Sequence, residues 1–367
     1  MNDSIFSPNY TITARIEFTL EAIDRNRWLI DNLLLMPKHE TWLHREVRVS
    51  RAAGTTRIEG AKLDEQAVAE LTRQALPGAK NEDEQENINA FQAYEFIDFL
   101  SDQEDIPVDE LVMRQLNRYF ISTAPATLTP GAYRKGSNSV GDFQPPDQGD
   151  VPDLMRSFAL WLKDEGDEPH PVIKAGLAHL HMVAIHPFWD GNGRTARGLE
   201  TLLLQRSTFG FRKLLSLEAT LLKIKDQYFS SLRQTLGTGF SAEYDATPWL
   251  EFSTTALKLC SDLLVEQTTD WHRMMQDARD RWEATGWPQR YVDAYALAVQ
   301  SGRITRSDYV DITGVSVATA SRDLAAMVDA GVLISAGKTR SRIYRPVNLD
   351  AMDSSDLPKE QLPLDLG

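Results

Sequence analysis

The sequence contains a single cysteine, no long apolar run and a deficit of positive charge. Cys260 is the only cysteine among the 367 residues, which excludes an intrachain disulfide and a cysteine-rich zinc site and indicates a reducing compartment. No apolar stretch has membrane-spanning length, and residues 1–15 lack the apolar region of a signal peptide, so we expect a cytoplasmic protein without membrane contact. With 39 Lys and Arg against 53 Asp and Glu, the net charge of −14 argues against electrostatic binding of nucleic acid by the molecule as a whole.

What is present indicates a globular, mostly α-helical protein. Hydrophobic residues make up 42% and charged residues 25% of the chain, and its length favours more than one domain. Apolar side chains recur at helical spacing along most of residues 11–275. The predicted helices span 11–36, 40–53, 63–76, 84–102, 108–121, 150–164, 171–185, 194–207, 218–235 and 245–275.

Residues after Trp282 differ in character and predict a separate small domain. Two short helical patterns flank Gly314, and two alternating segments joined by a basic turn follow, as in a helix-turn-helix with a wing behind it. Residues 303–345 hold seven Arg or Lys against four Asp, so the sign of the charge reverses there. Such a domain contacts DNA or, alternatively, another protein. The candidate DNA contacts are Arg322, Lys338, Arg340 and Arg342.

The segment most informative about chemistry is HPFWDGNGRTAR, residues 186–197. Pro187 disfavours the α conformation at His186, so the imidazole should lie at a helix end and face the following loop. Gly191 and Gly193 lie just before a predicted helix, where backbone N–H groups and the helix dipole favour an anion such as phosphate.

Two arginines and an aspartate strengthen this interpretation. Arg194 and Arg197 lie near the start of the predicted helix, where a cation is disfavoured unless an anion or an acidic side chain accompanies it. Asp190 lies beside the two glycines. A single carboxylate next to phosphates is a usual ligand of Mg²⁺, so Asp190 is the candidate metal ligand. His179 and His181 point about 200° apart on one helix, so they cannot share a metal ion, and we interpret His179 as a core histidine.

The same segment resembles the Fic motif HPFx[DE]GNGRxxR at every specified position. The resemblance implies a protein adenylyltransferase, which moves AMP from ATP to a target hydroxyl and releases pyrophosphate. It implies that His186 is the general base, that Phe188 anchors the loop and that Asp190 holds Mg²⁺. The residues that it assigns to the ATP phosphates are Gly191, Asn192, Gly193, Arg194 and Arg197.

Three further segments resemble parts of Fic proteins. TTRIEG, residues 55–60, resembles the inhibitory pattern [ST]xxxE[GN], which implies that Glu59 neutralises Arg197 and takes the place of the γ-phosphate, with Thr55 fixing the inhibitory helix. Residues 129–152 resemble the Fic flap, a hairpin that accepts an extended target segment, with its tip at 136–138. Tyr228 falls where related proteins place an aromatic near the adenine, although a core tyrosine is the alternative. The implied flap residues are Lys135, Gly136, Ser137, Asn138, Ser139 and Val140.

We therefore predict a mostly α Fic helical fold with a β-hairpin flap and a small C-terminal winged helix. The expected regions are a regulatory segment (1–105), a Fic core (106–278), the winged helix-turn-helix (279–348) and an acidic flexible tail (349–367). The expected function is AMP transfer from ATP to Ser, Thr or Tyr hydroxyls of target proteins and of the enzyme itself. The alternatives are a DNA-binding regulator with a nucleotide-sensing Fic domain and an enzyme that also removes AMP. Beyond the target, the expected partners are a second copy in a homodimer, DNA, and a sliding clamp bound by QLPLDL (361–366), which resembles the clamp-binding peptide QLxLxL.

Overall fold

The chain divides into two compact units, one of residues 1–34 and 43–264 and the other of residues 35–42 and 265–367. The computed structural model describes residues 6–33, 37–73, 78–122, 129–163, 169–283, 287–300, 302–337 and 342–347. Within these ranges helices predominate, which confirms the mostly α prediction, and none of them combines the length and the apolar character that crossing a bilayer requires.

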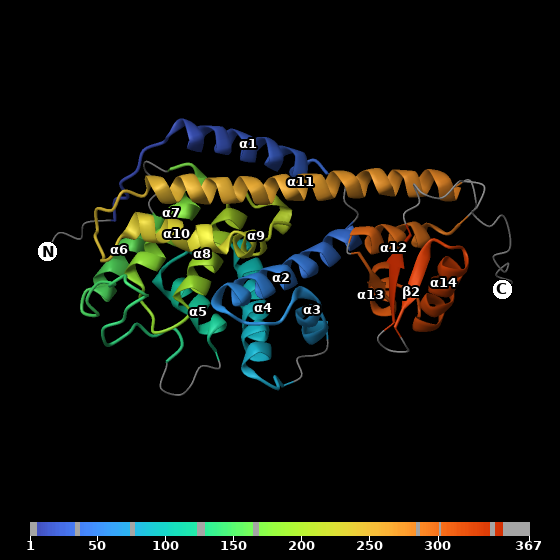
Figure 1. The fold of residues 1–367 in the computed structure, drawn as a ribbon, viewed down its shortest axis with the longest axis horizontal. Helices are drawn as coiled ribbons and strands as arrows, with labels where there is room; N and C mark the ends of the chain where they lie inside the picture. Colours follow the sequence, from blue (N-terminus) through green and yellow to red (C-terminus); the bar gives the residue numbers. More distant parts are fainter. Residues whose placement is uncertain are drawn as a thin grey trace. The chain divides into compact units, whose positions relative to one another are not determined.

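The first unit holds most of the segments predicted as regulatory region and Fic core, whereas residues 35–42 and 265–278 of those segments belong to the second unit (Figure 1). Its helices are α1 (Ala14–Asp31), α2 (Pro37–Glu59), α3 (Glu65–Arg73), α4 (Glu82–Ser101), α5 (Glu110–Phe120), α6 (Val151–Lys163), α7 (Pro171–Ile185), α8 (Asn192–Arg206), the 3₁₀ helix η1 (Phe211–Lys213), α9 (Leu217–Lys223), α10 (Lys225–Leu236) and α11 (Thr247–Glu283). The division between the units falls within α2 and within α11.

The centre of this unit is the pair formed by α7 and α8. Helix α7 is apolar on nearly all sides, and almost all of its side chains are buried, as its sequence requires of a helix surrounded by others. Gly198 lets α8 approach its neighbours, because an added Cβ would lie 2.9 Å from Phe120 and 3.1 Å from Ile97. On the other side of α7, Trp249 of α11 donates from Nε1 to the carbonyl oxygen of Gly176 at 2.7 Å.

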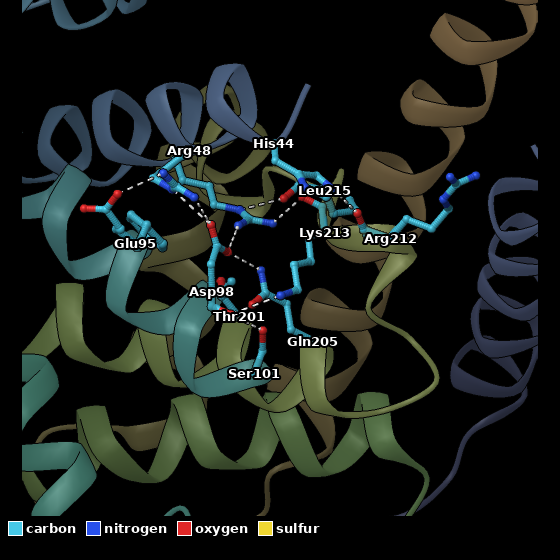
Figure 2. A network of polar contacts seen from close by, with 12 residues as sticks. His44, Arg48, Glu95, Asp98, Ser101, Thr201, Gln205, Arg212, Lys213 and Leu215 are labelled. Atoms are coloured by element: carbon cyan, nitrogen blue, oxygen red, sulfur yellow. Dashed lines mark hydrogen bonds and ion pairs between the residues drawn. The ribbon is translucent and has the colours of Figure 1, made fainter. Parts of the chain in front are cut away.

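Helix α2 is attached to the core by a network centred on Asp98 (Figure 2). Asp98 of α4 accepts from Arg48 Nη2 at 2.8 Å and from Arg51 Nη1 at 3.3 Å, and Gln205 of α8 joins at 3.0 Å. Burial alone would raise the pKa of Asp98, but Arg51 and Arg48 hold it below its usual value. The carboxylate therefore stays ionised and fixes α2 against α4 and α8.

The same network holds a left-handed turn that follows α8. Phe211, Arg212 and Lys213 all have positive φ, at 46°, 53° and 62°. Left-handed backbone costs a non-glycine residue about 1–2 kcal/mol, so the surrounding contacts must maintain the turn. Two residues of α2 supply them: His44 Nε2 lies 2.8 Å from the Arg212 carbonyl oxygen, and Arg51 Nη2 donates to that of Lys213 at 3.1 Å.

The second unit combines a helix-turn-helix with a three-stranded antiparallel sheet of order β1-β3-β2. Its elements after α11 are α12 (Gln289–Gln300), β1 (Ile304–Thr305), α13 (Arg306–Thr313), α14 (Val317–Asp329), β2 (Leu333–Ala336) and β3 (Ile343–Pro346). Gly314, at φ 71°, ends α13, and Ser316 caps α14. In the register, Tyr344 of β3 pairs with Ile304 and with Ser335.

Two sequence expectations need correction. The helix predicted over 218–235 breaks at Ile224, whose φ of −113° and ψ of 33° separate α9 from α10. The predicted β-hairpin flap is a loop whose described strand pairing consists of two isolated bridges, an antiparallel one between Val140 and Phe143 and a parallel one between Gln144 and Gly239. Two prolines follow Gln144, at 145 and 146, and proline cannot donate to a strand ladder.

The contact between α2 and α9 predicts a strong effect of a small substitution. A Cβ at Gly54 would lie 2.8 Å from both the backbone N of Ala219 and the backbone C of Glu218. We expect Gly54→Ala to lower the free energy of unfolding by about 1–3 kcal/mol, measured by urea denaturation, because backbone atoms cannot yield as a flexible side chain can. Gly149→Ala is the control, since no atom lies within 4 Å of its added Cβ. Equal stability of both variants would contradict the prediction.

Candidate active site

The loop between α7 and α8 is shaped by two left-handed residues. His186 ends α7 at φ 49° and ψ 56°, in agreement with the expectation that Pro187 excludes the α conformation there. Gly191 precedes α8 at φ 75°. An added Cβ at Gly191 would lie 2.7 Å from Ile121, so glycine is required there for both conformation and space.

Asn192 closes this loop with its side chain. Its Oδ1 accepts from the Phe188 backbone N–H at 2.9 Å, and its Nδ2 donates to the Phe188 carbonyl oxygen at 2.9 Å. The Phe188 ring is 1% exposed, as expected of an anchor. The predicted phosphate ligand Asn192 thus has both ends of its amide engaged in holding the loop.

Two residues outside the motif fix the same loop, and sequence reasoning missed both. Asn117 of α5 donates to the Asp190 carbonyl oxygen at 2.9 Å and accepts from the Gly131 N–H at 3.0 Å. Arg134 donates to the carbonyl oxygens of His186 at 2.9 Å, Gly136 at 3.1 Å and Pro146. The only sequence signal for Arg134 was its place beside the predicted flap residues, because its carbonyl partners carry no side-chain signature.

Arg197 lies in the core with all of its guanidinium nitrogens engaged. It is 2% exposed, and its Nε donates to Thr55 Oγ1 at 2.9 Å. Its Nη2 donates to the Thr55 carbonyl oxygen at 3.2 Å and to Glu59 Oε1 at 2.6 Å, and its Nη1 lies 3.4 Å from the Tyr228 hydroxyl. The structure thus brings together Thr55, Glu59 and Arg197, the three residues that the resemblance to the Fic inhibitory pattern associates.

The Glu59 carboxylate lies against the start of α8. A Cβ at Gly193 would be 2.8 Å from Glu59 Oε1, so the carboxylate lies directly over this glycine. Burial alone would raise the pKa of Glu59, but Arg197 holds it below its usual value. An ionised carboxylate therefore occupies the place where the helix N-terminus and Arg197 attract an anion.

Arg194 and Asp190 form a second pair at the edge of the site. Arg194 Nη2 donates to both oxygens of Asp190 at 3.1 Å, and its Nη1 donates to Glu86 Oε1 at 3.2 Å. Asp190 Oδ1 also accepts from the Gly191 N–H at 2.6 Å, and the Asp190 side chain is half exposed. Glu86 was not singled out from the sequence. Within the described ranges, no three His, Cys, Asp or Glu side chains gather as a metal cluster, so a metal ion here would need phosphate ligands.

His186 is held as a neutral imidazole. Burial lowers the pKa of His186 from 6.5 to about 4, against the opposing effect of a backbone hydrogen bond at Val183 and of the Glu59 and Asp190 charges. The ring is therefore unprotonated at neutral pH, which is the form in which a general base starts.

The predicted flap residues lie beside this loop. Lys135, Ser137, Ser139 and Val140 are exposed, and Val140 is 44% so. Gly136 lies against the half-exposed Trp189, whose ring would be 3.0 Å from an added Cβ. The tight turn of the flap occurs between Val140 and Phe143, not at the tip expected over 136–138.

The remaining candidates lie apart from the loop. Tyr228 is 1% exposed and packs against Trp249 and Phe252, so its ring lies in the core and not on a surface that could receive an adenine. His179 and His181 are buried and point to different neighbours, Glu200 and Tyr244. In the second unit, Arg322 and Arg342 are exposed. Lys338, Arg340 and the segment 361–366 lie outside the described residues.

Comparison with known proteins identifies this part of the chain. Residues 107–204 match the model of the Fic/DOC family. Among curated proteins, Protein adenylyltransferase Fic of Nematostella vectensis is 33% identical over 141 residues, 38% of this chain and 32% of that protein. Its Drosophila melanogaster counterpart is 35% identical over 140 residues, 38% of this chain and 28% of that protein. The chain therefore spans about a third of the length of these curated relatives.

Solved structures show the same fold. A Fic family protein from Desulfovibrio desulfuricans superposes with a TM-score of 0.62 at 24% identity, over 93% of this chain and 98% of that chain. Fic-1 from C. elegans superposes with a TM-score of 0.55 at 23% identity, over 69% of this chain and 71% of that chain. His186 and Arg197 both lie inside residues 107–204, the segment that matches the model of the Fic/DOC family.

Proposed function

We propose that this protein transfers AMP from ATP to a hydroxyl group of a protein target. The observation that carries the proposal is the carboxylate of Glu59 over Gly193, bonded to Arg197 at 2.6 Å, at the positive end of α8. This place is built to hold an anion, and a side chain of the same chain fills it. The curated relatives that share the domain are named protein adenylyltransferases, which supports AMP transfer here.

The phosphates of ATP would replace the acidic side chains that now satisfy the arginines. Arg197 would bind the distal phosphates in place of Glu59, and Arg194 would bind them in place of Glu86 or Asp190. Gly193 at the start of α8 leaves room for an anion to approach the backbone, because it has no Cβ.

His186 would act on the target. Its neutral imidazole takes the proton from the target hydroxyl, the hydroxyl oxygen forms a bond to the α-phosphorus, and the bond to the β-phosphate breaks to release pyrophosphate. Arg134 holds the His186 carbonyl oxygen and the flap at once, so it positions the base relative to the target segment.

Asp190 is suited to Mg²⁺. It is a half-exposed carboxylate next to the anion site, and a single carboxylate together with phosphate oxygens is a common way to hold this ion. When bound, Mg²⁺ would neutralise charge on the phosphates as pyrophosphate departs. Release of Asp190 from Arg194 would free both for these roles.

Glu59 would keep the resting enzyme inactive, with Thr55 fixing the inhibitory helix through Arg197. An enzyme that also removes AMP remains the alternative direction, and incubating a modified target with and without Glu59 decides between them. The flap would receive the target over residues 135–140. The cytoplasmic location, the homodimer and the contact of residues 361–366 with a sliding clamp stay predictions.

We propose further that the second unit, as a winged helix-turn-helix, binds duplex DNA through α14. Two of the four aspartates within residues 303–345 are engaged inside the unit: Asp308 is buried in the capping box of α13, and Asp323 accepts from Arg290 at 2.7 Å and from the Tyr309 hydroxyl at 2.8 Å. Asp311 and Asp329 are exposed, so the described surface of this segment carries two aspartates against four arginines, an excess of positive charge that suits a phosphate backbone. The exposed arginines described within residues 303–345 are Arg306, Arg322, Arg342 and Arg345.

Removal of the inhibitory carboxylate tests the AMP transfer. We expect Glu59→Gly to raise self-modification by ATP, measured as AMP incorporation and identified by mass spectrometry, because the anion site becomes free. The double variant Glu59→Gly with His186→Ala should modify itself about 10²–10⁴-fold more slowly than Glu59→Gly, since it keeps the open site but lacks the base. A Glu59→Gly protein that binds ATP yet modifies nothing would instead favour a nucleotide sensor.

The half-buried imidazole of His186 predicts an unusual titration. We expect the His186 resonance, assigned by its loss in His186→Ala, to show no protonation between about pH 5.5 and 8 in NMR spectra. A lowered pKa keeps the neutral form of His186 dominant down to about pH 4. The rate of AMP transfer should therefore not decline as the pH falls through 6.5, where an ordinary imidazole would become protonated. A titration midpoint near 6.5 would contradict this.

Arginine substitution tests the DNA contact. The full chain should bind a duplex selected from a random-sequence pool, with affinity that falls as salt rises, in fluorescence anisotropy. Arg322→Ala should weaken binding by about 1–3 kcal/mol, whereas Arg15→Ala, an exposed arginine of α1, should not. Equal affinities of the two variants, or no binding at low salt, would point to a protein partner instead.

A further inference from the structure

Behind Arg197, on residues that the Fic motif does not include, a buried chain of polar groups runs through α7, α8 and α10. Glu200 Oε2 lies 2.6 Å from His179 Nδ1, and His179 Nε2 lies 2.9 Å from the Tyr228 hydroxyl. The same hydroxyl lies 3.4 Å from Arg197 Nη1. None of these four side chains is more than 6% exposed, so water does not compete for their hydrogen bonds.

We propose that Tyr228, oriented by His179 and Glu200, is a positioning residue that keeps the Arg197 guanidinium aimed at the anion site when Glu59 leaves. Thr55 and Glu59 both belong to the inhibitory helix α2, so any movement of α2 that opens the site threatens three of the four contacts of Arg197. The Tyr228 contact comes from α10 and does not depend on α2.

The direction of each hydrogen bond follows from the ends of the chain. We assign His179 Nδ1 as the donor to Glu200 Oε2, because a carboxylate oxygen accepts, and His179 Nε2 as the acceptor on the other side of the ring. The Tyr228 hydroxyl consequently donates to His179, and burial raises the pKa of Tyr228 to about 12, which keeps this proton in place. The lone pairs of the hydroxyl oxygen are left to face Arg197, and each bond polarises the next.

A fixed guanidinium improves binding of the distal phosphates, because less freedom is lost when the nucleotide arrives. This consequence rests on the proposed function, in which Arg197 contacts those phosphates. AMP lacks them, so its affinity should not depend on Arg197 orientation. The difference between ATP and AMP therefore separates positioning of Arg197 from general damage to the site.

The test compares two buried tyrosines in the Glu59→Gly protein. We expect Tyr228→Phe to weaken ATP binding about threefold to tenfold by calorimetry and to leave AMP binding within about twofold. Tyr244→Phe is the matched control, since its hydroxyl bonds another buried histidine, His181, at 2.8 Å, and it should change neither affinity. In turnover, the loss should appear as a higher KM for ATP.

Equal weakening of ATP and AMP, or no difference from Tyr244→Phe, would overturn the proposal. If the Glu59→Gly protein binds no ATP at all, the proposed function fails, and NMR of the arginine side chains then tests the positioning by itself. There, Tyr228→Phe should speed rotation of the Arg197 guanidinium, whose signals are assigned by Arg197→Lys. Unchanged guanidinium signals would contradict the role of Tyr228 without reference to any nucleotide.

Discussion

A cation buried near the positive end of a helix is the constraint on which this structure depends. Arg197 is 2% exposed, and without a negative partner its charge would be uncompensated. Glu59 supplies that partner from another helix at 2.6 Å, and its position over Gly193 is the position of an anion at the start of α8. Compensation of the Arg197 charge therefore depends on helix α2, which carries Glu59.

Helix α2 is in turn held far from Glu59. Arg51 and Arg48, two and three turns before Glu59, both bond Asp98 of α4, and Arg51 also bonds the left-handed turn after α8 (Figure 2). Gly54, between Arg51 and Glu59, lies so close to α9 that no larger residue fits without a shift. Placement of the Glu59 carboxylate thus depends on packing along the whole second half of α2, while the loop between α7 and α8 depends on Asn117 and Arg134.

Much of the fold and of the site could be predicted from the sequence, because both depend on patterns of neighbouring residues. Helical periodicity located most helices, for example α7 over 171–185, and Pro187 with Gly191 defined the loop that carries His186. The flap was less predictable, because whether Val140 and its neighbours pair as strands depends on partners elsewhere in the chain. Ile224 was missed as a helix end because no glycine or proline marks it.

The sequence by itself determined the residue types of the anion site, since a helix start with two arginines needs an acidic partner or an anionic ligand. The pairing of Glu59 with Arg197 was implied only by the resemblance of residues 55–60 to the Fic inhibitory pattern. Only the tertiary structure decided which groups form hydrogen bonds with one another. Arg134 and Asn117 act on backbone carbonyl and amide groups, which every residue possesses, so no pattern of side chains announces their partners. The alignment of Glu200, His179 and Tyr228 behind Arg197 likewise exists only because three helices pack together.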